Sequence, residues 1–320
     1  MRRALIAAAA MSAAALTTTS ALAQYPERPI TMIVAYSAGG GTDIAARTLV
    51  PYIEKYLGED ATITVVNRTG AGGEIGFTAL AMAEPDGYTI GFINAPNILT
   101  IPIQRETRYS MDDIEPVANI VYDPGGFSVL PDAGINTLDE LVTYAKENPG
   151  EVSYGTTGIG SDDHLAALAF ERLAGIEMNH VPFDGNADVR AALLGGHIDL
   201  GSGNVSEMIP DANAGNVVLL GQMAEERWEG APDVPTFQEQ GFDIVIGSNR
   251  AIGAPAGFPE DALAQLSEAI EKAVQDPEFR EQAEKQDLAL AFQGSEEFAQ
   301  TLGRLQQQFE ALWESEPWVE

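Results

Sequence analysis

Short β-rich runs alternate with helical patterns along the chain, and this alternation is the feature that most constrains its fold. Strands are expected at residues 30–35, 63–66 and 88–93, with helices at 42–57 and 75–83 between them. This βαβαβ order is typical of an α/β domain built on a parallel sheet. We therefore expect an α/β fold.

The second half of the chain repeats this style. A turn followed by a strand is expected at 123–131, where the sequence reads "DPGGFSVLP". The remaining expected helices are 137–147, 161–173 and 187–194, and the remaining expected strands are 152–155, 179–183, 198–200 and 217–222.

Beyond residues 242–257 only helices are expected, at 259–275, 277–286 and 295–315, with Ser295 as the N-cap of the last one. A chain that begins one α/β domain, builds a second and closes with helices predicts a return to the first domain. The length of 320 residues suits two domains, because single hydrophobic cores rarely grow beyond about 250–300 residues. Two domains make a cleft between them possible.

The N-terminus carries the three regions of a secretory signal peptide. Met1-Arg2-Arg3 precedes an apolar run, and Ala21-Leu22-Ala23 offers a cleavage site, so residues 1–23 are interpreted as a signal for export to the periplasm. The remaining chain has no apolar run near about 18 residues, which predicts no membrane insertion. The absence of cysteine excludes disulfides, thiolate chemistry and lipid attachment to an N-terminal cysteine.

The formal net charge is −31, which excludes nucleic acid as an expected partner. A strongly acidic surface favours solubility. It is also consistent with adaptation to a saline medium, in which screening would shorten the range of its field to about 3 Å at ~1 M salt.

Four glycine-rich runs each follow an expected strand, at 36–43, 67–76, 155–164 and 200–204. Glycine lets the backbone approach a ligand, and its N–H groups can then bind a carboxylate or phosphate without a basic side chain. Ligands of open α/β sheets bind at the carboxyl ends of the strands. The alternative for each run is a tight turn with no ligand.

The glycine-rich runs do not match the sequence motifs of the enzymes and metal sites considered. Ile75 stands where the dinucleotide fingerprint needs glycine, and Ile159 stands two residues before Ser161, so no nucleophile elbow is formed there. Asp162, Asp163 and His164 are consecutive and point about 100° apart on a helix, so they cannot face one metal ion together. A metal chaperone is therefore disfavoured.

The run "GIGSDDH" allows two interpretations of its aspartates. Ser161 suits an N-cap, and Asp162 and Asp163 then complement the positive end of the helix dipole, which is the favoured interpretation. If one aspartate faces inward, it would select a ligand that offers a donor such as a hydroxyl or amine.

Five segments carry a family resemblance: "YPERPITMIVAYSAGGGTDIAAR", "VVNRTGAGGEIGFTALAMAEPDGYTI", "YGTTGIGSDDHL", "HVPFDG" and "GAPAGFPEDAL". In this order and spacing they resemble the periplasmic solute receptors of tripartite tricarboxylate transporters, also called Bug proteins. The resemblance implies a two-lobed periplasmic binding protein of type II with a ligand cleft between the lobes, no catalysis and no cofactor. It places residues 24–121 and 250–320 in lobe 1 and residues 122–249 in lobe 2.

The same resemblance implies a small organic anion as ligand, a di- or tricarboxylate, and membrane permease subunits as partners of a monomer. Its ligand would be held largely by backbone N–H groups. The site residues implied are Ser37, Ala38, Gly39, Gly40, Asp43, Gly70, Ala71, Gly72, Gly73 and Asn94 in lobe 1, and Gly158, Gly160, Ser161, His164, Phe183, Asp184 and Asn204 in lobe 2.

The sequence departs from the commoner family pattern at Tyr36, at the two aspartates after Ser161 and at Asn249-Arg250. Tyr36 brings a hydroxyl to the expected cleft. Arg250 is one of few cationic side chains, and a guanidinium there can bind a carboxylate with two parallel hydrogen bonds. The equally weighted alternative is an interlobe salt bridge, for example with Asp123.

The rival function is a secreted hydrolase with an Asp/His/Ser cluster around Ser161 and His164. It would need a nucleophile hydrogen-bonded to a base.

Overall fold

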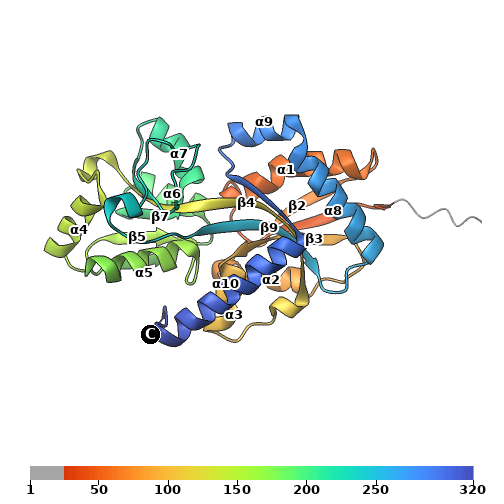
Figure 1. Cartoon of the computed structure of the whole chain (residues 1–320), viewed down its shortest axis with the longest axis horizontal. Helices are drawn as coiled ribbons and strands as arrows, with labels where there is room; N and C mark the ends of the chain where they lie inside the picture. Colours follow the sequence, from red (N-terminus) through yellow and green to blue (C-terminus); the bar gives the residue numbers. More distant parts are fainter. Residues whose placement is uncertain (1–24, 320) are drawn as a thin grey trace, which may run out of the picture.

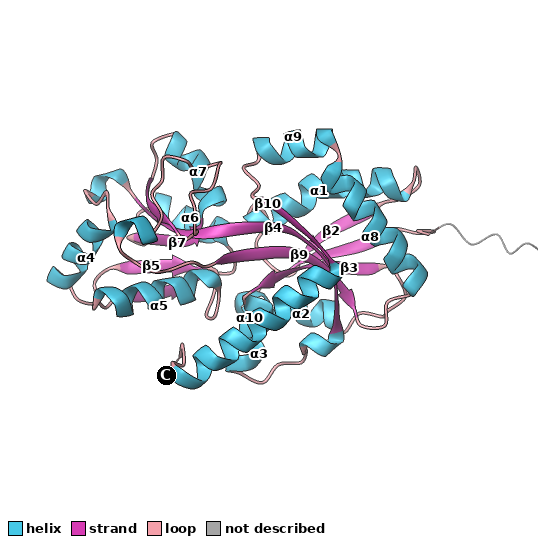
Figure 2. Ribbon diagram, in the orientation of Figure 1, coloured by secondary structure: helices cyan, strands magenta, loops and turns pink. Residues whose placement is uncertain are grey.

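The computed structural model describes residues 25–319, in which two α/β lobes are joined by two long strands (Figure 1). The expected signal peptide at residues 1–23 lies outside the described residues. The α/β fold class expected from the alternating pattern is confirmed. Helices lie on both faces of the strands in each lobe (Figure 2).

The first lobe is built on three parallel strands, with β1 (Ile30–Val34) between β2 (Ile63–Asn67) and β3 (Thr89–Ala95). Six helices cover this sheet. On one face lie α1 (Gly41–Leu57), α8 (Glu260–Gln275) and α9 (Pro277–Lys285), and on the other α2 (Glu74–Ala81), α3 (Asn97–Gln104) and α10 (Ser295–Ser315).

Helix α1 shows why this lobe forms. Ala45, Leu49 and Ile53 recur every four residues, so they share one face, and all three are buried. They pack in one core cluster with Leu266 and Ile270 of α8. The C-terminal helices therefore complete the first lobe, as the sequence pattern predicts.

The second lobe contains β5 (Ser153–Thr156) and β6 (Asn179–Pro182) in parallel, with β7 (Leu200–Asn204) beside β5. Its core includes aromatic contacts: Phe127 and Phe170 meet edge to face at 5.3 Å between ring centroids. The lobe also contains β8 (Val218–Gln222) and four helices, α4 (Leu138–Glu147), α5 (Asp162–Ala174), α6 (Asn186–Leu194) and α7 (Val205–Asn213).

Two antiparallel strands connect the lobes, β4 (Ile114–Val129) and β9 (Gly247–Pro255). The path through the sheet is β2-β1-β3-β9-β4-β7-β5-β6, with β8 paired to β4. The prediction of a turn in "DPGG" is wrong, because Pro124 lies inside β4 and Gly125 N donates to Ile246 O at 2.9 Å. The glycines permit close approach: a Cβ on Gly126 would lie 2.8 Å from Gly221 O.

The prediction that the fourth glycine-rich run is a turn is also wrong. Residues 200–204 form strand β7 itself, not a turn that follows a strand. A Cβ on Gly201 would lie 2.8 Å from Ser128 Oγ, and one on Gly203 would lie 2.6 Å from Asn186 Oδ1. These glycines serve the packing of neighbouring elements, so the sequence signal of a turn was misleading here.

Three features of the C-terminal and helical predictions need correction. Strand β10 (Leu290–Gly294) pairs antiparallel with β4 where only helices were expected. Gly294, not Ser295, is the N-cap of α10, and Ser295 Oγ donates to Pro116 O at 2.7 Å. Helices α3 and α7 escaped prediction because each is short and contains a proline, Pro102 and Pro210.

No helix within residues 25–319 is both long enough and apolar enough to cross a membrane.

Gly76 and Gly303 provide a matched test of helix packing, because both lie inside helices. A Cβ on Gly76 would stand 2.6 Å from Ala35 Cα, whereas a Cβ on Gly303 meets nothing within 4 Å. We expect Gly76→Ala to lower the free energy of unfolding by about 1–3 kcal/mol. Gly303→Ala should raise it by roughly 0.5–1 kcal/mol through helix propensity. Urea unfolding of both variants measures this, and equal effects would contradict the packing of α2 on β1.

Candidate functional site

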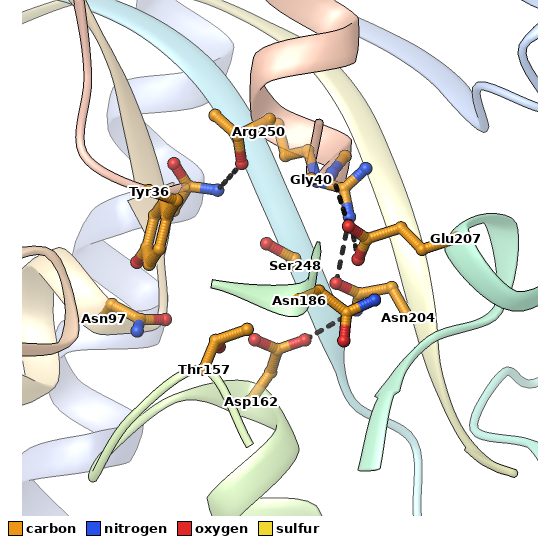
Figure 3. Close-up of a pocket in the computed structure, with 13 residues that line it drawn as sticks. Tyr36, Gly40, Asn97, Thr157, Asp162, Asn186, Asn204, Glu207, Ser248 and Arg250 are labelled. Atoms are coloured by element: carbon orange, nitrogen blue, oxygen red, sulfur yellow. Dashed lines mark hydrogen bonds and ion pairs between the residues drawn. The ribbon is translucent and has the colours of Figure 1, made fainter. Parts of the chain in front are cut away.

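A small polar cavity lies between the two lobes, with a volume of about 20 Å³ (Figure 3). This is space for roughly one water molecule. Its walls come from both lobes and from the crossing strand β9. The lining residues are Tyr36, Gly40, Gly41, Thr42, Asn94, Asn97, Thr157, Asp162, Asn186, Asn204, Glu207, Ser248 and Arg250.

The first lobe contributes the N-terminus of α1. Its N-cap Gly40 supplies no side-chain cap, so the first N–H groups of the helix have no acceptor from their own helix. Asp43 fixes the preceding turn: its Oδ2 accepts from Gly39 N at 2.9 Å, and its carboxylate is held by Arg47. Although burial opposes it, the hydrogen bond from Arg47 lowers the pKa of Asp43.

The second glycine-rich turn, residues 70–73, does not line the cavity. Instead it meets the second lobe, because a Cβ on Gly158 would lie 2.8 Å from Gly72 Cα. Gly72 O accepts hydrogen bonds from Tyr36 at 3.3 Å and from Asn97 at 3.2 Å. This turn therefore orients two cavity-lining side chains and touches the opposite lobe.

Arg250 lies at the centre of the site and is 1% exposed. Its Nη2 atom lies 2.9 Å from Asp123 Oδ2 and 3.0 Å from Glu207 Oε2, while Nη1 has no hydrogen-bond partner. Although burial opposes it, Glu207 and then Asp123 raise the pKa of Arg250, so the guanidinium stays charged. The salt bridge with Asp123 is thus present, and the ligand contact of Arg250 stays a prediction.

The two aspartates after Ser161 have different surroundings. Both lie in the first turn of α5, as the helix-dipole interpretation expects. Asp162 also lines the cavity and accepts from Asn204 Nδ2 at 2.7 Å, so contact with a ligand stays a prediction. Burial raises the pKa of Asp162 to about 6. Asp163 turns away and accepts from Thr157 Oγ1 at 2.6 Å and Thr157 N at 3.1 Å.

Ser161 is the N-cap of α5, as predicted, and accepts from the backbone N–H of His164 at 3.1 Å. The His164 ring makes no hydrogen bond to the Ser161 hydroxyl; its Nδ1 accepts from Gly160 N at 3.3 Å, and it stacks on His180 at 4.3 Å between centroids. Burial lowers the pKa of His164 to about 3. Ser161 and His164 therefore do not form the nucleophile–base pair that the hydrolase alternative needs.

Among residues 25–319 no three His, Cys, Asp or Glu side chains are placed to hold a metal ion.

Five residues of the expected site line the cavity: Tyr36, Gly40, Asn94, Asn204 and Arg250. The others support it from behind or lie apart. Ser37 donates to Asp188 of the second lobe, and Asp184 is exposed. The expected residues that do not line the cavity are Ser37, Ala38, Gly39, Asp43, Gly70, Ala71, Gly72, Gly73, Gly158, Gly160, Ser161, His164, Phe183 and Asp184.

Sequence reasoning missed several lining residues. Glu207 lies in the first turn of α7, a helix that the sequence pattern did not predict. Asn186 is the first residue of α6, which was expected to begin one residue later. Gly41 and Thr42 lie in the glycine-rich run 36–43 and begin α1, so their position at a helix N-terminus is the sequence signal that indicates them. The missed lining residues are Gly41, Thr42, Asn97, Thr157, Asn186, Glu207 and Ser248.

Comparison with known proteins gives one family. Residues 45–313 match the family model described as "Tripartite tricarboxylate transporter family receptor". The chain is 32% identical to Protein BugT of Bordetella pertussis over 78% of both chains.

Solved structures of periplasmic binding proteins share the fold. That of the periplasmic binding protein BugD is 29% identical, with a TM-score of 0.85 over 91% of this chain and 98% of the other. That of MatC from Rhodopseudomonas palustris with bound malate is 26% identical, with a TM-score of 0.83 over 90% and 99%. The two-lobed binding-protein fold is thereby confirmed.

Arg250→Ala tests the buried ion pair. The variant leaves the carboxylate of Asp123 buried without its cation, so we expect the free energy of unfolding to fall by about 3–5 kcal/mol. Chemical denaturation measures this loss. Arg304→Ala, at an exposed position of α10, should change stability by less than about 0.5 kcal/mol. Equal effects of the two substitutions would contradict the structural role of Arg250.

Asp162→Asn tests the raised pKa of Asp162. An unfolded aspartate has a pKa of ~4, so the folded state holds the proton over a window in which the unfolded state has lost it. The resulting stabilisation is fully present below about pH 4 and is lost as the pH rises through about 6. The free energy of unfolding of the variant relative to wild type should therefore rise by roughly 2 kcal/mol from pH ~4.5 to ~7.5. A difference that is constant with pH would refute the shift.

Proposed function

The chain belongs to the tripartite tricarboxylate transporter receptor family, and from this premise we propose that it binds a small organic di- or tricarboxylate between its lobes and delivers it to membrane permease subunits. The proposal includes export through a signal peptide at residues 1–23 and action as a monomer in the periplasm, without a cofactor. The chain is a periplasmic solute-binding protein by family; the carboxylate and the permease are the proposed part.

One observation carries the proposal: a helix N-terminus and a charged guanidinium meet at the same interlobe cavity. The first residues of α1 and Arg250 both line it. The N–H groups at a helix N-terminus favour an anion, and a guanidinium binds carboxylate by directed hydrogen bonds. A chain with a net charge of −31 can thus offer a local anion site.

The strand connections support opening and closing of the lobes. We place the boundaries after residues 121 and 249, which makes lobe 1 residues 24–121 with 250–320 and lobe 2 residues 122–249. Val121 is in register with Arg250 and Tyr122 with Asn249, so both boundaries fall at one level of the paired strands β4 and β9. Two crossing segments at one level suit a hinge.

The size of the cavity defines what binding requires. A volume of about 20 Å³ is too small for a dicarboxylate, so the lobes must separate or the lining side chains must move before the ligand enters. The malate bound to MatC gives a precedent for the ligand class in a protein of the same fold.

A thermal-shift assay on the chain without residues 1–23 tests this function. The panel contains succinate, malate, adipate and citrate, with NaCl at matched ionic strength to remove general salt effects on an acidic protein. A ligand at about 100 times its Kd stabilises the folded state by about 2.7 kcal/mol, which raises the unfolding midpoint. We expect at least one acid to exceed the NaCl control. The proposal would be contradicted if none of the acids raised the unfolding midpoint above the NaCl control. It would also be contradicted if only Mg²⁺ or Zn²⁺ raised it.

A further inference from the structure

A carboxylate of the second lobe occupies the anion-binding end of α1. Glu207, in the first turn of α7, accepts a hydrogen bond from Gly41 N through its Oε1 atom. Its Oε2 atom accepts from Arg250 Nη2 at 3.0 Å. One carboxylate therefore satisfies a helix N–H group of lobe 1 and the central guanidinium together (Figure 3).

These are the two donors that the proposed function assigns to the ligand. Helix α1 lacks a side-chain cap of its own, since Gly40 and Gly41 have no side chains. The place of the cap is taken by Glu207, a side chain from the opposite lobe. Because Gly41 has no Cβ, the guanidinium also packs closely: a Cβ there would lie 2.6 Å from Arg250 Cζ.

The guanidinium retains capacity for a further acceptor. Arg250 Nη1 is buried, has no hydrogen-bond partner and belongs to a side chain that lines the cavity. A buried donor without an acceptor is unfavourable, and a bound carboxylate would remove that cost. Glu207 thus occupies one terminal nitrogen of the guanidinium, Nη2, and leaves the other, Nη1, without an acceptor.

A second carboxylate contacts the same turn from the same lobe. Asp188, in the first turn of α6, accepts a hydrogen bond from Ser37 Oγ. Two acidic side chains of lobe 2 therefore reach the turn and helix end of lobe 1 in the closed arrangement. Glu207 and Arg250 both line the small cavity that remains.

We propose that Glu207 is a built-in competitor that occupies the carboxylate subsite, so that a ligand carboxylate binds by displacing it from Gly41 N and Arg250. The inference rests on the proposed function, because it assigns the displaced position to the carboxylate ligand. Glu207 also holds the lobes together in the absence of ligand. Affinity and selectivity are then set by the exchange of one carboxylate for another.

Glu207→Gln tests the exchange. The substitution keeps the shape of the side chain but removes its negative charge. That charge competes with the ligand for Arg250 and repels the ligand carboxylate. Isothermal titration of wild type and variant with the acid identified in the thermal-shift panel should show at least tenfold tighter binding by Glu207→Gln. The matched control is Glu147→Gln, an exposed position of α4, which should bind as wild type does.

A second measurement guards against a folding defect. Glu207→Ala removes the side chain that holds the lobes together in the absence of ligand. Small-angle scattering of the ligand-free variant should therefore give a larger radius of gyration than ligand-free wild type. Saturating acid should restore the smaller value. Weaker or unchanged affinity in Glu207→Gln, when wild type binds the acid, would overturn the exchange and leave the proposed function intact. Absence of binding by wild type and both Glu207 variants would reject the proposed function itself, and the exchange with it.

Discussion

The buried guanidinium of Arg250 is the interaction on which the arrangement of the two lobes depends. It lies on a strand that crosses between them and pairs with Asp123 on the other crossing strand and with Glu207 in the second lobe. A charge in so little solvent is costly unless its partners are well placed. Asn204, Asp123 and Glu207 supply that placement, and each in turn is held by an element of the second lobe or by β4. The charge fixes the relative position of the two crossing strands and α7, and the apolar contact of Leu165 with the cluster of lobe 1 adds to it.

The architecture follows largely from local patterns. Buried residues spaced along α1 and the β-rich runs of the first lobe predict its elements to within a few residues. The pattern failed where glycine and proline serve packing instead of turning the chain. Pro124 continues β4, and the glycines of residues 200–204 let β7 approach its neighbours. A sequence shows the small residue but not the neighbour that requires it.

The site was less predictable than the fold, for a related reason. Tyr36, Gly40 and Arg250 follow from a turn motif and a rare cation in an acidic chain. Glu207 and Asn186 carry no such signal, because an acidic or amide residue at a helix start is usually a solvated one. Their role depends on the docking of two lobes, which depends on contacts distant in the sequence. Asp162 belongs to a run that the sequence singles out, but its hydrogen bond with Asn204, at the end of β7, joins positions that are distant in the sequence.

The position of β9 has a consequence for how the chain acquires its structure. A polypeptide is synthesised from its N-terminus, and domains usually fold as units while it emerges. Here β9 lies between β3 and β4, so the inner edge of the first sheet stays unpaired until residues 247–255 have emerged. The whole second lobe, from β5 to β8, is made during that interval. The first lobe therefore matures last although it is begun first, and its open strand edge is the part of the nascent chain most in need of protection from aggregation.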